Sequence, residues 1–434
     1  MNLRLQALID EAKSYVSALS NRGGFVRNSF TLTMGTAFAQ SIPIMLSPVL
    51  ARLFSPHEFG LFAVVSSITA IISVISTGKY ETVVVIAKSN RNAVNLIALS
   101  LILSFLISII SLAIFFSFSG TVVNLLKQPE LKHWILLSPL ISFLISIYLC
   151  YNEWCIRLSH FKTLSLNKVV NASSISLSNV LFGFLKIPTG GLIFGEVLGR
   201  FISALSCIFN VFRTNISEFK AVTLSRISFL SKRYSDCPKY ILPGQFLNTL
   251  GGQMVVLLIT SFFGSSEVGY YSMTILVLYV PSTIISTAVR DVFKQRATAE
   301  YNAKKNCYDI FRRITLAISV FSFFIFAVLF VILPDLFQFA FGKEWRIAGE
   351  YARILSPMVF ISFISESVFG VLIIAEKMKA VLIWQAEYFI VNIGSLLLGY
   401  FVFKDIKMAL LFFMAGKSLV HLHSLYLSYI YSRG

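Results

Sequence analysis

The chain consists of long apolar segments of about 20 residues, separated by short polar loops. A segment of this length suits an α-helix that crosses a hydrocarbon core of about 30 Å, whereas a barrel strand would be about half as long and would alternate. Of the 434 residues, 56% are hydrophobic and only 13% are charged, against roughly 25% charged in soluble proteins. The sequence therefore predicts an all-α integral membrane protein.

The apolar segments number about twelve, six in each half of the chain. They define an N-terminal lobe, residues 29–213, and a C-terminal lobe, residues 240–434. A basic cytoplasmic linker, residues 214–239, joins the lobes, and residues 1–28 form an amphipathic segment that we expect to lie on the cytoplasmic membrane surface. The expected spans are 29–50, 59–77, 93–116, 134–152, 169–185, 191–211, 240–263, 269–289, 314–333, 354–374, 381–402 and 408–429.

A short polar stretch occurs near the start of each half. Residues 54–62 read FSPHEFGLF and residues 262–271 read FFGSSEVGYY. A shift of 209 positions places Gly60 on Gly269, and both copies lie between two long apolar runs. This match indicates a duplicated unit. Because each half has an even number of spans, the repeat is parallel, and we expect a pseudo-twofold axis along the membrane normal.

The net charge of +17 is spread unevenly over the loops. Loops on the side of the N-terminus hold about 26 Lys and Arg, and the opposite loops hold about nine. Basic loops mark the cytoplasmic side, so we expect both termini in the cytoplasm. This bias is the main cause of the charge, and the remaining cations could line a cavity for an anionic substrate. No nucleic-acid partner is expected. The five cysteines show no metal-ligand or CxxC spacing, so we expect no metal and no cofactor.

One helix combines an ion pair with a glycine stripe. Charged residues within a span face a bundle interior or a watery cavity. Glu196 and Arg200 lie four positions apart in the span 191–211, where an intrahelical ion pair is favoured. The stripe predicts close helix packing and consists of Gly191, Gly195 and Gly199. We therefore expect the pair at a helix contact or a cavity wall, and Arg200 is a candidate cavity cation.

The last span carries a second candidate cation. Lys417 lies deep in this span, with His421 one turn later. Lys417 could face a substrate cavity, or it could pair with Glu366 or Glu387 of the two preceding spans. The sequence leaves both interpretations open.

Uncharged polar residues occur in the first span of each half, where Gln40, Asn248 and Gln253 lie. Interrupted or polar helices in corresponding places of two halves point to a binding site. Polar residues also join helices by hydrogen bonds, so these three are candidates for either role.

Charged pairs follow the second span of each half at its cytoplasmic end. Lys79 and Glu81 end the first of these spans, and Arg290 and Asp291 end the equivalent one. They either anchor the helices at the interface or form an inner gate where the lobes meet.

Three stretches read RLFSPHEFGLF, TGKYETVVVIAKSNRNAVNL and GKEWRIAGEYARIL. They resemble the polysaccharide-transporter branch of the multidrug/oligosaccharidyl-lipid/polysaccharide (MOP) flippase superfamily, and within it the O-antigen (Wzx-like) flippases. The resemblance implies twelve helices in two lobes that form a V around a central cationic cavity. It also implies transport of an undecaprenyl-pyrophosphate-linked oligosaccharide from the cytoplasmic to the periplasmic leaflet of a bacterial inner membrane, without catalytic residues. Arg200 and Lys417 are the cavity cations it suggests.

Two other functions stay open. A multidrug or cation antiporter of the same superfamily would need acidic groups deep in the N-terminal lobe, which offers few. A membrane glycosyltransferase or polysaccharide polymerase would need positioned catalytic groups, and the loops are short. The sequence also leaves open whether transport is coupled to a proton or sodium gradient or to the membrane potential, and whether a polymerase and a chain-length regulator are partners.

Overall fold

A computed structural model describes residues 31–187, 190–214 and 216–434, and these residues form helices and loops without a β-strand. The amphipathic segment expected at residues 1–28 lies outside the described residues. Eleven helices of the described part are long and apolar enough to span a membrane. A twelfth long helix, α6 (Phe161–Phe184), is less apolar because it carries many polar residues. The prediction of about twelve spans is therefore confirmed.

The N-terminal lobe contains six of the long helices. It consists of Thr31–Leu53, α2 (Pro56–Ser76), α3 (Asn90–Leu126), α4 (Leu131–Trp134) with α5 (Ser138–Arg157), α6, and α7 (Gly191–Thr214). The helix α3 has 37 residues and is longer than the span expected at 93–116.

The C-terminal lobe contains the other six. It consists of α10 (Leu242–Phe263), α11 (Ser265–Thr274) continuing into α12 (Val280–Lys304), α13 (Tyr308–Phe341), α14 (Arg346–Val368) with α15 (Gly370–Ile374), α16 (Met378–Phe403) and α17 (Ile406–Ser432). The helix α13 continues through Pro334, beyond the end expected at residue 333.

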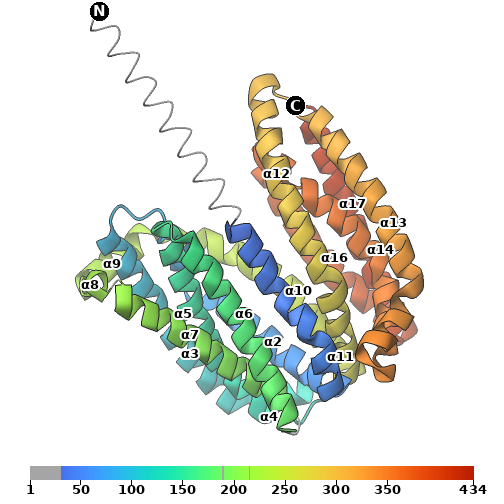
Figure 1. Cartoon of the computed structure of the whole chain (residues 1–434), viewed down its shortest axis with the longest axis horizontal. Coiled ribbons are helices and arrows are strands. Elements are labelled where there is room, and N and C mark those ends of the chain that lie inside the picture. Colours follow the sequence, from blue (N-terminus) through green and yellow to red (C-terminus); the bar gives the residue numbers. More distant parts are fainter. Residues whose placement is uncertain (1–30, 188–189, 215) are drawn as a thin grey trace, which may run out of the picture.

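The two lobes form a V (Figure 1). Their helices lie together near α4 and α11 and part toward the end of the molecule where the C-terminus lies. We call these the closed end and the parted end. The segment expected as a linker is folded at the parted end of the N-terminal lobe, as α8 (Ile216–Phe219) and α9 (Leu224–Arg233). The Tyr80 hydroxyl donates a hydrogen bond to the Ser231 carbonyl at 3.1 Å, which ties α9 to the lobe.

The sequence around Ser55 explains where α2 begins. Ser55 is the N-cap, and Pro56 occupies the first helical turn, where its missing N–H costs nothing. The Glu58 carboxylate accepts a hydrogen bond from the Ser55 N–H at 2.8 Å, and the Ser55 hydroxyl accepts one from the Glu58 N–H at 3.4 Å. This capping box fixes the direction in which α2 leaves the closed end.

The repeated stretch forms the contact between the lobes at the closed end. A Cβ atom added to Gly60 would lie 1.8 Å from the Ser265 carbonyl oxygen, and one added to Gly269 would lie 1.8 Å from the Pro56 carbonyl oxygen. The 209-residue shift carries Pro56 to Ser265 and Gly60 to Gly269. The same contact is thus made twice with the partners exchanged, which is what a twofold axis between two halves requires. The expected pseudo-twofold relation is confirmed.

A shared core reinforces the closed end. Trp345 of the C-terminal lobe is buried and donates its indole N–H to the Ala51 carbonyl at 2.9 Å. Its ring stands edge-on to Phe59 of α2, with the ring centroids 5.1 Å apart. Buried side chains of both lobes form one apolar cluster around these residues. Apolar packing and the glycine contacts together hold the lobes at this end, while the parted end stays separate.

Candidate functional site

Two adjoining pockets occupy the space between the lobes and along α6 and α7. Their volumes are about 480 and about 660 Å³. Both are lined by Phe62, Glu196 and Arg200, so they are parts of one hollow, which we call the central cavity. The helices α2, α5, α6, α7 and α10 contribute to its walls. The central cavity expected from the V-shaped arrangement is therefore present.

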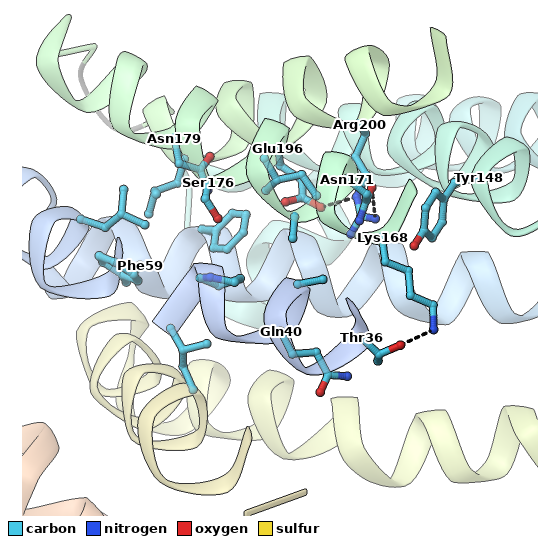
Figure 2. Close-up of a pocket in the computed structure, with 18 residues that line it drawn as sticks. Thr36, Gln40, Phe59, Tyr148, Lys168, Asn171, Ser176, Asn179, Glu196 and Arg200 are labelled. Carbon is cyan, nitrogen blue, oxygen red and sulfur yellow. Dashed lines mark hydrogen bonds and ion pairs between the residues drawn. The ribbon is translucent and has the colours of Figure 1, made fainter. Parts of the chain in front are cut away.

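The polar centre of this cavity is an ion pair on α7 (Figure 2). Arg200 Nε donates to Glu196 Oε1 at 2.8 Å, and Arg200 Nη1 donates to Asn171 Oδ1 of α6 at 3.3 Å. The side chains of Arg200 and Glu196 keep 21% and 12% of their exposure, so the pair faces the cavity while it is largely enclosed. The expected intrahelical pair at a cavity wall is confirmed.

The glycine stripe of α7 brings α6 close to this pair. A Cβ atom on Gly195 would lie 2.1 Å from Asn179 Oδ1, and one on Gly199 would lie 2.3 Å from the Ile175 Cα. Only glycine allows backbones to approach so closely. The predicted close-packing stripe is thus present, and it brings the polar face of α6 beside Arg200.

The sequence interpretation missed a second cavity cation, Lys168 of α6. Its ammonium donates to Thr36 Oγ1 at 2.8 Å across the cavity wall (Figure 2). Lys168 stands directly before the span expected at 169–185 and is not among the residues that the sequence analysis singles out. Its spacing from Asn171 and Asn179 could have revealed it, because the three residues recur at helical spacing on one face.

Lys79 is a third cavity cation. It lines the central cavity and lies 3.7 Å from the Glu81 carboxylate, and both residues are buried. Lys79 has a φ of 62°, a left-handed conformation that is unusual for a residue with a side chain. The pair expected as part of a gate is therefore a buried ion pair of the N-terminal lobe.

The other half of the expected gate lies on α12. Arg290 donates to the Thr287 hydroxyl at 3.2 Å, and Asp291 is exposed. Within the described residues, no hydrogen bond or ion pair joins Arg290 or Asp291 to Lys79 or Glu81. The two pairs lie on different lobes, which are parted at this end, and a gate formed by them stays a prediction.

The polar residues of the first spans are placed differently from one another. Gln40 lines one pocket of the central cavity and Gln253 lines the other. Asn248 is exposed and lies outside both linings. The cavity face of α10 is formed instead by Gln245, Thr249 and Gln253, which are four residues apart. Asn248 lies one position from this face. The presence of a polar residue in the span does not by itself show whether that residue faces the cavity.

Lys417 lies inside the C-terminal lobe and outside the linings of the central cavity. Its ammonium stands over the rings of Tyr279, Tyr388 and Phe413, 4.8, 5.6 and 5.7 Å from their centroids. Such cation–π contacts stabilise a cation away from water. Among the described ion pairs none includes Lys417, so neither carboxylate pairing is present.

Those two carboxylates have other partners. The Tyr279 hydroxyl donates to Glu366 Oε1 at 2.6 Å, and Glu387 Oε2 lies 2.6 Å from His423 Nδ1. His421 lies 3.4 Å from the Ser365 hydroxyl. The C-terminal lobe thus satisfies its intramembrane charges with its own aromatic and polar side chains.

Three cations line the central cavity: Lys79, Lys168 and Arg200. Arg200 is paired with Glu196 and Lys79 with Glu81, so one positive charge is in excess. Its other polar groups are amides and hydroxyls, which donate and accept hydrogen bonds. No group of three or more potential metal ligands occurs in residues 31–187, 190–214 and 216–434. The cavity is suited to an anionic ligand that carries many hydroxyl groups.

Known proteins share this architecture. One solved structure is a multidrug resistance MATE family transporter of the MOP superfamily in an inward-facing conformation, with a TM-score of 0.73, 13% identity, and coverage of 90% of this chain and 94% of that chain. Another is the lipid II flippase MurJ in an inward closed conformation, with a TM-score of 0.74, 12% identity, and coverage of 91% and 87%. These likenesses show the fold.

A third structure with this fold is a MOP superfamily transporter from Pyrococcus furiosus, whose binding pocket is described as having reverse polarity. Its TM-score is 0.64 at 12% identity, with coverage of 93% of this chain and 95% of that chain. No curated protein sequence matches the chain. Residues 49–349 match a family model described as polysaccharide biosynthesis protein, which covers well over half of the chain. The chain therefore belongs to this polysaccharide biosynthesis protein family and has the MOP transporter fold.

Proposed function

We propose that the protein is a flippase that moves an undecaprenyl-pyrophosphate-linked oligosaccharide, such as an O-antigen or related repeat unit, between membrane leaflets. The observation that carries the proposal is the central cavity between two parted lobes, whose walls carry Lys79, Lys168 and Arg200 and keep an excess of one positive charge beside the pairs with Glu81 and Glu196. Membership of the polysaccharide biosynthesis family supports a glycan substrate. The fold supports transport by alternating access, in which two lobes rock around a shared site.

The cations match the charged part of such a substrate. A pyrophosphate loses hydration when it enters a protein cavity, and charge-assisted hydrogen bonds from Arg or Lys offset that cost. Arg200 has a nitrogen free to turn toward a ligand, because Glu196 and Asn171 engage only Nε and Nη1. Lys168 contributes a second ammonium on the same wall. The amide groups of Gln40 and Asn171 suit the hydroxyls of a sugar.

The direction of transport follows from topology and charge. The basic loops indicate that the parted end faces the cytoplasm of a bacterial inner membrane, so the conformation shown would receive substrate from inside. Outward movement of each uncompensated negative charge is favoured by about 2.3 kcal/mol per 100 mV of membrane potential. The potential, or a proton or sodium gradient, would supply the energy, and a polymerase and a chain-length regulator would use the product. No covalent bond is made or broken.

Cells that build the lipid-linked sugar but lack this protein test the proposal. We expect the intermediate to accumulate on the cytoplasmic leaflet, where an oxidant or lectin added outside cannot reach it, while surface polysaccharide disappears. An intermediate that reaches the outer leaflet unpolymerised would instead assign the protein to polymerisation. Untouched polysaccharide together with increased drug sensitivity would favour the antiporter.

A further inference from the structure

A second hollow lies apart from the central cavity, at the parted end of the N-terminal lobe. It has a volume of about 820 Å³ and lies between the beginning of α3 and the helix α9. Its lining includes four basic side chains and no carboxylate: Lys88, Arg91, Arg226 and Arg233. None of its lining residues lines the central cavity, so the flippase mechanism leaves this hollow without a role.

The walls of this basic hollow are held by hydrogen bonds. Asn95 of α3 accepts from the Thr223 N–H at 2.9 Å and donates to the Ala221 carbonyl at 3.0 Å. Arg226 Nε donates to Asn92 Oδ1 at 2.8 Å, which orients the guanidinium. The hollow is therefore preformed, and its shape does not depend on a bound ligand.

Within the part of the chain that the structure describes, the four cations have no anionic partner. Among the described residues, no ion pair includes Lys88, Arg91, Arg226 or Arg233, and Arg226 bonds only to a neutral amide. Like charges gathered around one space repel one another. An anion in the hollow would relieve this repulsion and would accept charge-assisted hydrogen bonds.

The exposed apolar side chains of α9 indicate the source of such an anion. Its Ile227 and Leu230 are buried against the lobe, whereas Leu224 and Phe229 are 81% and 57% exposed. Phe229 itself lines the basic hollow. A short helix with exposed apolar side chains beside basic ones is typical of a membrane interface, where phosphate groups of anionic lipids gather near acyl chains. The hollow thus presents cations and apolar side chains to the same ligand.

We propose that the basic hollow binds the phosphate-bearing headgroup of an anionic phospholipid, from the leaflet at the parted end of the lobes. Its cations hold the phosphate, and Leu224 and Phe229 contact the acyl chains. The bound lipid adds to the hydrogen bonds that already hold α9 on the N-terminal lobe. This site is independent of what the central cavity carries, so failure of the flippase proposal would leave it standing.

Lipid titration of the purified full-length protein tests this site. Native mass spectrometry would follow binding of phosphatidylglycerol, of phosphatidylcholine with the same acyl chains, and of inorganic pyrophosphate. The test variant is Lys88→Gln, Arg91→Gln, Arg233→Gln, which spares Arg226 and its structural bond. The matched control removes three exposed cations of the same linker that lie outside the hollow: Lys220→Gln, Lys232→Gln, Lys239→Gln.

We expect phosphatidylglycerol to bind the natural protein and the control equally, and the test variant about a hundredfold more weakly, because each of the three removed cations near the headgroup weakens attraction roughly fivefold. Phosphatidylcholine should show no difference between the three proteins. Equal weakening in test and control variants would reveal only diffuse attraction to the basic linker and would overturn the proposal. Pyrophosphate binding as tight as that of the lipid would overturn the lipid as ligand and assign a free phosphate instead.

Discussion

The two lobes are equivalent at the closed end and different in their interiors. At the closed end, Gly60 and Gly269 make the same backbone contact with exchanged partners. Inside the lobes, Arg200 faces the central cavity with a carboxylate and an amide beside it, whereas Lys417 is enclosed by three aromatic rings. The repeat thus keeps the same contact in both halves at the closed end, whereas the charged residues that line the central cavity lie in the N-terminal lobe.

This difference shows that a charge within a span does not by itself mark a binding site. Arg200 and Lys417 look alike in the sequence, since each is a lone cation in an apolar helix with a polar residue four positions away. Their neighbours from other helices decide their roles: α6 brings amides to Arg200, and the aromatic rings of the C-terminal lobe seal Lys417. The predictions that follow test this contrast.

Neutralising the α7 pair should have the largest effect. We expect Arg200→Gln to lower flipping about tenfold or more, because a hydrogen bond to a charged group contributes roughly 1.5–3 kcal/mol. The double variant Glu196→Gln, Arg200→Gln separates function from structure, because it leaves no unpaired charge in the membrane. Flipping is measured as surface polysaccharide restored to cells that lack the protein, at matched protein levels. Full activity of the double variant would mean that the pair is only structural.

Replacing the contact glycines of the closed end by valine should have the next largest effect, and the effect should be equal for the two lobes. Gly60→Val and Gly269→Val each drive a side chain into a backbone carbonyl. Overpacking costs about 1–3 kcal/mol, which shifts the ratio of closed to open populations at this end by roughly 5- to 150-fold. We expect cysteines introduced near the closed end to be labelled more strongly, by a reagent added outside the cell, in these variants than in the protein with both glycines. Gly252→Val is the control, because no atom lies within 4 Å of its added Cβ. Unequal effects of the two variants would contradict the symmetry of this contact.

Replacing Lys417 should change transport little. Lys417→Met keeps the length of the side chain and removes a buried charge, and such replacements are often neutral or stabilising, against a loss of about 1–2 kcal/mol from the cation–π contacts. We expect near-normal flipping and a thermal midpoint within a few degrees of the natural protein. Loss of flipping at normal protein levels would show that Lys417 belongs to the transport route, and the contrast between the lobes would fail.

The sequence predicts the architecture well because hydrophobicity and charge bias are properties of each segment alone. Twelve spans and two related halves follow from segment length and the repeated motif, and the glycine stripe of α7 predicts its close contact with α6. The site is harder to predict because it depends on which faces meet. Lys168 was missed since α6 extends further toward its N-terminus than its apolar core, and Asn248 was proposed although it lies one position off the face formed by Gln253.

Thiol labelling should show the smallest effect and should map the cavity directly. All five native cysteines are buried. Burial, with a contribution from Glu300, raises the pKa of the Cys307 thiol to about 11. At pH 8 this thiol is therefore neutral and unreactive, and it becomes a reactive thiolate only as the pH approaches 11. The natural protein should remain almost unlabelled by a maleimide at pH 8.

Because the native cysteines are almost unlabelled, the labelling of a single introduced cysteine can be followed. Gln40→Cys should react quickly, because residue 40 is exposed and lines the central cavity. A lipid-linked oligosaccharide that occupies the cavity should slow this reaction, whereas a cysteine at the exposed Lys186, outside the cavity linings, should react at the same rate with or without it. Equal rates at residue 40 would mean that the substrate does not enter beside Arg200. Slowing at residue 40 alone would place the substrate in the N-terminal lobe and sharpen the contrast with the sealed cation of the C-terminal lobe.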